Sequence, residues 1–299
     1  MKILLLGKNG QVGWELQRAL APIGRVVALD REGGDGLCGD LADIEGLRLT
    51  IKSVQPDIIV NAAAYTAVDK AENEEAKALQ INHEAPKFLA EEMLQLNGWL
   101  VHYSTDYVFD GSGEKPWRED DATAPLSIYG KSKLLGEQAI ESSGCKHVIF
   151  RTSWVYGAHG NNFAKTMLRL AGERDHLQVI DDQIGAPTGA DLLADVTAHA
   201  LHRAVAMPEL AGLYHLTSAG ETSWYDYARF IVSSALSHGI KLKIENISPI
   251  STSEYQTCAQ RPRNSRLDTR KLVSNFGLHL PMWQDGITRL LKEVSGNRQ

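Results

Sequence analysis

The sequence predicts an α/β protein in which a doubly wound parallel sheet is accompanied by a smaller α/β lobe. In the first half of the 299-residue chain, short apolar runs alternate with longer segments whose apolar residues recur at spacings of three and four. This rhythm is typical of βαβ units, and hence of a parallel sheet with helices on both faces. In the second half, isolated helical patterns are separated by long turn-rich connections, which indicates a second and smaller lobe.

Strands and helices are expected to alternate through the first half. The strands are expected at residues 2–6, 25–29, 57–60, 99–104 and 147–152. The helices between them are expected at residues 12–20, 43–54, 85–96 and 129–142. Right-handed crossovers would put all five strands in one sheet, with the ligand crevice at the carboxyl ends of the strands.

The second half is expected to form a lobe that packs tightly on the sheet. Its helices are expected at residues 163–170, 191–203, 224–236 and 283–293. The tract 248–267 has little periodicity and is expected to be a loop over the active site. We therefore expect a first domain of residues 1–154 and about 185–204, and a smaller lobe of about 155–184 and 205–299.

Composition and charge narrow the class of partner. The formal net charge is -6 at pH 7, and binding to nucleic acid or to an anionic membrane needs a basic surface, so we expect a small-molecule partner instead. The three cysteines are far apart and include no Cys-x-x-Cys pair, which argues against disulfides and thiolate metal sites. The apolar run 3–6 is too short for a signal peptide or a membrane span. These features are typical of a cytoplasmic protein.

Three glycines follow the first expected strand. Gly7, Gly10 and Gly13 form a Gly-x-x-Gly-x-x-Gly run, which permits a tight turn and lets a helix N-terminus approach a pyrophosphate. Asp30 ends the second strand, where an acidic residue receives the adenosine ribose of NAD, whereas the adjacent Arg31 suits the 2′-phosphate of NADP. The run therefore predicts a Rossmann-like domain that uses NADH or NADPH; a turn that serves packing alone is the alternative.

Two further segments are candidates for cofactor contact. Asp40 and Leu41 lie where another strand would end, and could contact the adenine; a helix N-cap is the alternative. The small side chains of Asn61-Ala-Ala-Ala would allow the backbone to come close to the cofactor, although a close helix–sheet contact needs the same residues.

Thr105, Tyr129 and Lys133 form the candidate catalytic group. Tyr129 and Lys133 are four residues apart on an expected helix, and therefore share one face. Reduction of a ketone needs a proton as well as a hydride, and a free tyrosine, with a pKa of about 10, is a slow acid at pH 7. A nearby ammonium lowers that pKa. We expect Tyr129 to donate the proton, Lys133 to make it more acidic, and Thr105 to orient the carbonyl oxygen.

Several motifs in chain order resemble those of one family. Beside the glycine run and the Tyr-x-x-x-Lys pair they include residues 104–109 (STDYVF), 151–156 (RTSWVY), 160–163 (GNNF), 183–188 (QIGAPT) and 261–266 (RPRNSR). Over its whole length the chain resembles the extended short-chain dehydrogenases/reductases and, among these, the family of dTDP-4-dehydrorhamnose reductases.

The resemblance implies an activity and a set of contacts. It implies that NADH or NADPH reduces C4 of dTDP-4-dehydro-L-rhamnose while Tyr129 donates the proton, in nucleotide-sugar and cell-surface polysaccharide (O-antigen) biosynthesis. The first domain would bind NAD(P) and the second lobe the sugar nucleotide. The substrate contacts would be Thr105, Asp106 and Trp154, the last packing on the sugar. The cofactor contacts would be Gly7, Gly10, Gln11, Val12, Gly13, Asp30, Asp40, Leu41, Ala63, Ala64, Tyr65, Thr66, Tyr129 and Lys133.

The resemblance also implies a homodimer with Mg²⁺ at its interface. The expected ligands are Glu15, Asp191 and Glu293, with solvated helix faces as the alternative. Asn162 and either Arg263 or Arg266 are candidate diphosphate contacts, because polar and forked cationic groups suit phosphate oxygens; loop stabilisation or solvation is the alternative.

Two competing functions stay open. A dehydratase or epimerase of the same fold would retain NAD⁺, and a dehydratase would need Asp-Glu after the threonine, whereas Asp106 is followed by Tyr107. A non-catalytic regulatory subunit could lose Tyr129 or Lys133, and both are present. Among the histidines, His102 is expected in the core or at the surface rather than as a ligand.

Overall fold

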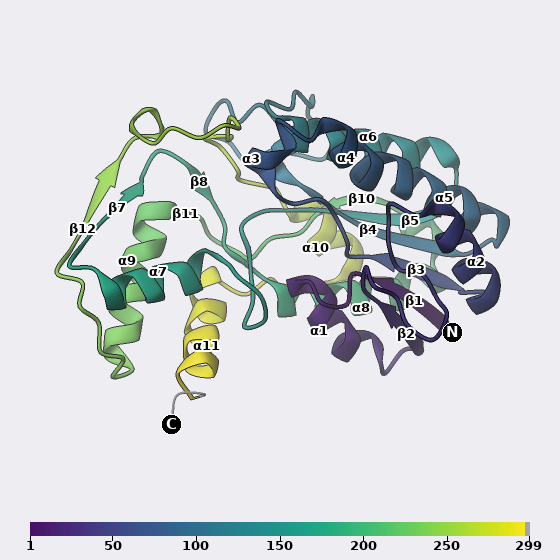
Figure 1. Cartoon of the computed structure of the whole chain (residues 1–299), viewed down its shortest axis with the longest axis horizontal. Helices are drawn as coiled ribbons and strands as arrows, with labels where there is room; N and C mark the ends of the chain where they lie inside the picture. The colour runs from purple at the N-terminus through teal and green to yellow at the C-terminus, as the bar shows by residue number, and fades with distance from the viewer. Residues whose placement is uncertain (297–299) are drawn as a thin grey trace.

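The computed structural model describes residues 1–296, with side chains as far as Val294. Its centre is a six-stranded, wholly parallel sheet in the order β10-β5-β4-β3-β1-β2, which confirms the predicted fold class (Figure 1). The strands are β1 (Lys2–Leu6), β2 (Arg25–Leu29), β3 (Ile58–Asn61), β4 (Trp99–Thr105), β5 (Lys146–Thr152) and β10 (Gly212–His215).

Helices cover both faces of the sheet because its strands are apolar on both sides. Ile3 and Leu5 of β1 pack into one buried cluster, whereas Leu4 and Leu6 pack into another on the opposite face. The first face is covered by α1 (Gln11–Leu20) and α8 (Ala190–Ala206), and the other by α2 (Ile44–Val54), α5 (Ala85–Gln95) and α6 (Ile128–Ser143). The expected helices are thus present, with ends that differ by a few residues.

The sixth strand, β10, and the absence of a strand before Asp40 differ from the sequence prediction. β10 has four residues and begins with glycine, which strands disfavour, so its pairing with β5 rather than its composition makes it a strand. The segment that leads directly into Asp40 is not a strand. There the Thr50 hydroxyl accepts from the Cys38 N–H and donates to the Cys38 carbonyl. A side chain there replaces the partner that a sheet would provide.

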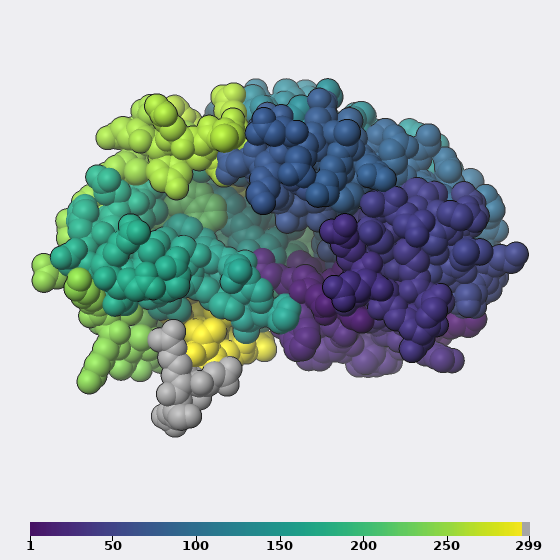
Figure 2. Space-filling view, viewed as in Figure 1, coloured from purple at the N-terminus to yellow at the C-terminus, as the bar shows by residue number. Residues whose placement is uncertain are grey.

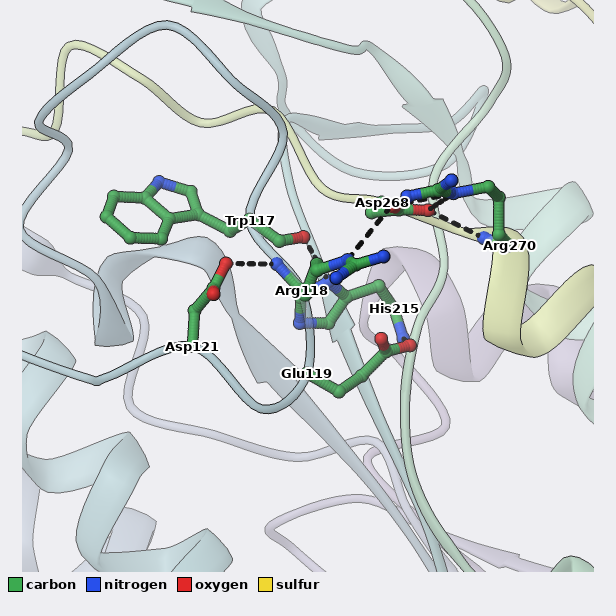
Figure 3. A network of polar contacts seen from close by, with 7 residues as sticks. All are labelled: Trp117, Arg118, Glu119, Asp121, His215, Asp268 and Arg270. Carbon is green, nitrogen blue, oxygen red and sulfur yellow. Dashed lines mark hydrogen bonds and ion pairs between the residues drawn. The ribbon is translucent and has the colours of Figure 1, made fainter.

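The outer edge of β10 is covered by the segment 117–121 (Figure 3). The backbone N–H of His215 donates to Glu119 Oε1 at 2.9 Å, and the His215 ring lies 3.0 Å from the carbonyl oxygen of Trp117. Arg118 forms an ion pair with Asp268 at 3.9 Å. The backbone N–H of His215 is therefore not free to pair with a strand of another chain.

The second lobe packs three helices around their own apolar cluster. They are α7 (Phe163–Glu173), α9 (Trp224–Ser237) and α11 (Trp283–Gly296), beside the parallel pair β7 (His176–Ile180) and β12 (Asn246–Ile250). The shorter elements are α3 (Val68–Ala71), α4 (Glu75–Leu79), β6 (Val155–Tyr156), β8 (Ile184–Gly185), β9 (Thr188–Gly189), β11 (Thr222–Ser223) and α10 (Arg270–Phe276), with single helical turns at Gln80–Glu84, Asp106–Val108, Pro208–Leu210 and Thr252–Glu254.

The expected domain division requires one change. Residues 205–299 were expected in the smaller lobe, but β10 lies in the main sheet, and Leu272 and Phe276 of α10 pack in its core. We propose that β10 and α10 belong to the first domain. Within the described residues, no helix combines the length and apolarity needed to cross a membrane.

Candidate active site

Two cavities open into the hollow between the N-terminal domain and the second lobe (Figure 2). The first, of about 700 Å³, lies at the carboxyl ends of β1 to β4 and is called the cofactor cavity below. The second, of about 620 Å³, is lined mostly by the smaller lobe and is called the substrate cavity. The expected cofactor contacts that line the first are Gly7, Gly10, Gln11, Val12, Asp30, Ala63, Ala64, Thr66, Tyr129 and Lys133.

The glycine run forms the tight turn that leads into α1. Gly7 has a φ of +90°, and the Gly10 N–H donates to the Gly7 carbonyl at 3.0 Å. A Cβ on Gly13 would lie 2.0 Å from that carbonyl oxygen, so only glycine fits there. Gly10 caps α1 without a side-chain hydrogen bond, which leaves the first N–H groups of the helix to an anion. Gly13 therefore acts by letting α1 pack against the Gly7 carbonyl, and among the described residues it does not line the cavity itself.

Gly13→Ala should destabilise the protein by about 1–3 kcal/mol, the usual cost of overpacking, and weaken cofactor binding. Gly10→Ala is the matched control for folding, because its Cβ would meet only the Gly7 oxygen, at 3.4 Å. Denaturant unfolding measures the first effect and fluorescence titration with NADH the second. Equal stability of the two variants would show that the turn is not tightly packed at Gly13.

Asp30 and Arg31 both line the cofactor cavity. Asp30 accepts from Asn9 at 2.6 Å and lies 3.5 Å from Lys8 Nζ, while Arg31 lies 3.3 Å from Asp40. Asp40 is outside the cavity lining in the described residues, and the N-cap of α2 is Asp43. Asp40 therefore influences the cofactor cavity only through its ion pair with Arg31, which lines the cavity.

Leu41 and Tyr65 are also outside the cofactor-cavity lining in the described residues. Leu41 is buried in the apolar core, so its side chain is not free to cover an adenine. The side chain of Tyr65 packs near Ala71, while its backbone N–H donates to Asn82. A backbone contact is all that the position of Tyr65 leaves for a cofactor.

The catalytic candidates come from the end of β4 and the start of α6. Ser127 caps α6 by accepting from the Gly130 N–H, so the helix places Tyr129 in its first turn and Lys133 in its second. Thr105 ends β4, and its hydroxyl donates to Asp106 Oδ1 at 3.1 Å. A hydrogen bond with Thr105 lowers the pKa of Tyr129, yet burial outweighs it and raises that pKa to about 12. Thr105 and Tyr129 thus meet, and Tyr129 and Lys133 both line the cofactor cavity.

Lys133 does not act on Tyr129 as the sequence argument expected. Its Nζ donates to the Tyr103 carbonyl at 2.6 Å and lies 3.1 Å from His102 Nε2, both in β4. No hydrogen bond joins Lys133 to Tyr129 in the described part of the chain, and Lys133 does not contribute to the pKa of Tyr129. Burial lowers the pKa of Lys133 to about 8. Their spacing on one face of α6 brings Tyr129 and Lys133 close together. The direction of the Lys133 amine, however, is set by its contacts with β4.

Asp106 is a buried carboxyl group. Burial raises its pKa to about 6, against the opposing effects of hydrogen bonds from Ser265 and Thr105. Its second oxygen, Oδ2, has no hydrogen-bond partner within the residues that the structure describes. Asp106 and Thr105 lie behind the linings of the two cavities, and a ligand could reach Oδ2 only after a side chain moves.

Trp154 is the expected substrate contact that lines the substrate cavity. Its ring stacks on Trp224 at a centroid distance of 3.6 Å, and the backbone has a φ of +49°. Gly185 also lies close to Trp154, since a Cβ there would come within 2.8 Å of the indole. Both indoles line the substrate cavity, so they give it an apolar, aromatic section of wall.

Asn162 and Arg263, two of the expected diphosphate contacts, do not line the substrate cavity in the described residues. Asn162 caps α7 and donates to Gln11 at 3.0 Å, which is a loop-stabilising role. Arg263 is exposed, and its Nε lies 3.7 Å from Asp182. The cavity is lined instead by Arg261, which forms a 2.7 Å ion pair with Asp69. The path of an aperiodic loop decides which of these arginines faces inward, so the motif alone could not identify Arg261.

The three expected magnesium ligands do not fit a metal ion in this structure. Glu15, Asp191 and Glu293 line one small cavity, but the Arg289 guanidinium is there too, 3.2 Å from Asp191 and 3.1 Å from Glu293. Among the described residues, no three histidine, cysteine, aspartate or glutamate side chains are grouped to hold a metal ion. The guanidinium supplies the positive charge that the carboxylates require, so the expected Mg²⁺ site is not supported.

Comparisons with known proteins identify the family. The family model described as RmlD substrate binding domain matches residues 1–295. The dTDP-4-dehydrorhamnose reductase of Escherichia coli K12 is 55% identical over 294 residues, 98% of each chain. The crystal structure of the Clostridium acetobutylicum enzyme of that name is 35% identical with a TM-score of 0.89, covering 99% of this chain and 100% of that one.

A second solved structure contains a cofactor. The dTDP-4-dehydrorhamnose reductase of Bacillus anthracis in complex with NADP is 36% identical with a TM-score of 0.87, covering 98% of this chain and 99% of that one. The resemblance inferred from the motifs is thereby confirmed. The chain belongs to the family of dTDP-4-dehydrorhamnose reductases.

Proposed function

We propose that this protein reduces the C4 ketone of dTDP-4-dehydro-L-rhamnose to dTDP-L-rhamnose with NADH or NADPH, in nucleotide-sugar and cell-surface polysaccharide biosynthesis. The observation that supports this most is the position of Tyr129. It lines the cofactor cavity, and its ring contacts Tyr107, which lines the substrate cavity, at a centroid distance of 5.5 Å. A proton donor at this junction can reach a carbonyl oxygen while the cofactor faces the carbonyl carbon.

The cofactor, when bound, supplies the hydride that forms the new C4–H bond. Tyr129 Oη supplies the proton that converts the oxygen into a hydroxyl, and becomes a phenolate. Because its pKa is raised to about 12, Tyr129 is protonated and ready to donate at neutral pH. The same shift makes the phenolate costly, so a charged Lys133 that turns towards Tyr129 would stabilise it. Thr105 would orient the carbonyl oxygen, since it already bonds to Tyr129.

The substrate would be held by three groups around its cavity. Trp154 and Trp224 offer apolar ring surface to the sugar, and Asp106, whose partner Ser265 lines the cavity, would accept from a sugar hydroxyl once a side-chain movement exposes Oδ2. Arg261 offers a guanidinium to the diphosphate, for which it would exchange part of its contact with Asp69. Arg261 therefore replaces Arg263 as the proposed diphosphate contact.

Arg31→Ala should lower affinity for NADPH roughly tenfold and leave affinity for NADH nearly unchanged, because only NADPH has a 2′-phosphate for the guanidinium to meet. Arg31 lines the cofactor cavity with an exposed side chain. Arg25→Ala, at the start of β2, is a matched control outside that cavity. Fluorescence titration with each cofactor measures both affinities, and an equal loss for the two cofactors would exclude this role for Arg31.

A homodimer and a cytoplasmic location stay predictions. Light scattering on the purified protein, with and without EDTA, measures the assembly. We expect a dimer whose mass does not change with EDTA, since Arg289 already neutralises Asp191 and Glu293. A dimer that dissociates when EDTA is added would restore the magnesium interface.

The proposed reaction is tested by mixing the protein with dTDP-4-dehydro-L-rhamnose and either reduced cofactor. We expect one molecule of NADH or NADPH to be oxidised for each molecule of keto sugar consumed. Conversion of the sugar without net oxidation of added cofactor would contradict the reductase and favour an epimerase or dehydratase. No turnover of the keto sugar or of related nucleotide sugars would favour a regulatory subunit.

A further inference from the structure

Asn61, His102 and Lys133 form a buried polar chain beside the cofactor cavity. Lys133 Nζ lies 3.1 Å from His102 Nε2, and the other ring nitrogen, His102 Nδ1, lies 3.2 Å from Asn61 Nδ2. The chain is built by the sheet, because Asn61 of β3 and His102 of β4 are register partners. His102 is only 1% exposed, so water cannot serve as an alternative partner for its ring.

The backbone N–H of Ala63 fixes the direction of these hydrogen bonds. It donates to Asn61 Oδ1 at 3.2 Å, so the amide oxygen faces Ala63 and the amide nitrogen faces the His102 ring. An amide nitrogen can only donate, and His102 Nδ1 must therefore accept. Burial holds the pKa of His102 well below its usual value, so the ring is neutral and its single proton is on Nε2.

The Nε2–H of His102 then faces the Lys133 side chain. An ammonium has no lone pair and would oppose one donor with another, whereas an uncharged amine can accept from Nε2–H. The amine still donates to the Tyr103 carbonyl at 2.6 Å. In the arrangement that the structure shows, the network is therefore satisfied when Lys133 is uncharged and held on β4.

A second arrangement satisfies a charged Lys133. The ammonium donates to His102 Nε2, the ring proton moves to Nδ1, and Asn61 turns its oxygen to the ring. The Ala63 N–H then loses its acceptor. Because Ala63 lines the cofactor cavity, this N–H becomes a free donor at the place where a cofactor would bind. The two arrangements differ in which partner Ala63 has and in the charge of Lys133.

Other charged groups near Lys133 do not replace this control. Glu137 is one turn further along α6 and raises the pKa of Lys133, but Arg151 of β5 binds its carboxylate at 2.7 Å. Asp106, which follows β4, raises the pKa of Tyr129 and so helps to keep that residue neutral. It is not among the groups that shift the pKa of Lys133. From the neighbouring turn Gln80–Glu84, the buried group is the neutral Asn82, which donates to Ser132 of α6.

We propose that Asn61 and His102 are positioning residues for Lys133: together they select between an amine held on His102 and an ammonium, and they link that choice to the Ala63 N–H in the cofactor cavity. The catalytic role of this link rests on the proposed function, because proton donation by Tyr129 is what a charged Lys133 would assist. The network itself is a property of the free protein.

The first experiment uses the cofactor-free protein with ¹⁵N-labelled histidine and ¹³C-labelled lysine. NMR reports the tautomer of His102 and the ionisation of Lys133 across the pH range, with His102→Phe and Lys133→Met identifying the signals. We expect the His102 proton on Nε2 at high pH and on Nδ1 at low pH, with the change at the same pH as the Lys133 titration. A tautomer that stays constant while Lys133 titrates would overturn the proposal.

The second experiment changes Asn61 to a group that can only accept. In Asn61→Asp, the carboxylate accepts from both Ala63 N–H and Nδ1–H, so the ammonium is favoured and the Lys133 titration moves to higher pH. The added negative charge would also raise it, and the double variant Asn61→Asp/His102→Phe retains this charge without the ring. Asn61→Asp should raise the proton affinity of Lys133. We expect this increase to be at least tenfold smaller in the double variant than in the single variant. Equal shifts would show that charge alone acts.

The two proposals fail separately. If the linked titration is observed but no keto sugar is reduced, the proposed function is wrong and the network stands. If the reductase is active and the titration is not linked, the network is wrong and the function stands. In an active enzyme, the pH above which kcat/KM falls should be higher in Asn61→Asp than in the wild type, which a purely structural role for Asn61 would not produce.

Discussion

Tyr129→Phe will lower kcat by roughly 10²–10⁴-fold, the usual contribution of a positioned general acid, while cofactor affinity stays within about twofold. The phenylalanine ring retains the packing against Tyr107, and only the hydroxyl that donates the proton is lost. Steady-state kinetics with the keto sugar measures the first quantity, and fluorescence titration with NADH the second.

Tyr107→Phe is the matched control for this substitution. It removes a neighbouring hydroxyl from the same aromatic pair, on a ring that lines the substrate cavity rather than the cofactor cavity. We expect Tyr107→Phe to change KM more than kcat. A Tyr129→Phe variant with full activity would show that another group donates the proton, and the catalytic assignment would be wrong.

Glu137→Gln will destabilise the fold by about 3–5 kcal/mol, because it leaves the charge of Arg151 buried without a counter-charge. Arg151 donates twice through Nε, at 3.0 and 3.2 Å, and once through Nη2 at 2.7 Å to the Glu137 carboxylate. Neither side chain is more than 5% exposed. Arg151 Nη1 already lacks a partner in the described residues, so the loss has no local compensation.

Glu173→Gln provides the comparison for a surface pair. Glu173 binds Arg169 at 2.9 Å on α7, but both side chains are more than half exposed. Exposed pairs of this kind contribute about 0–1 kcal/mol. Urea unfolding of both variants measures the difference. If Glu137→Gln is as stable as Glu173→Gln, the buried pair does not hold α6 on β5.

The parts of the fold that the sequence predicts are those with strong local patterns. β1, β3 and the first three residues of β4 are apolar runs, which suits strands buried on both faces, and the glycine run marks the turn into α1. β10 has no such pattern, and becomes a strand only because β5 offers its edge. Tertiary pairing of this kind leaves no trace in a four-residue segment.

The site was predictable to the level of residue groups but not of individual contacts. Spacing along α6 placed Tyr129 and Lys133 on one face, yet the direction of the Lys133 amine depends on His102 and Tyr103 from another element. A lone histidine on a strand gave no signal for this role. Likewise, the family resemblance implied Mg²⁺ at three carboxylates that are far apart in the sequence, and only the packed structure shows that Arg289 lies among them.

Transfer of deuterium from the cofactor to the sugar tests the central claim most directly. The protein is incubated with dTDP-4-dehydro-L-rhamnose and NADPH that carries deuterium at nicotinamide C4 on both faces, in ordinary water. We predict one deuterium at C4 of the product sugar for each NADPH oxidised, because Tyr129 delivers the other hydrogen to oxygen, where it exchanges with water. A product whose C4 hydrogen comes from water would contradict hydride reduction at this site.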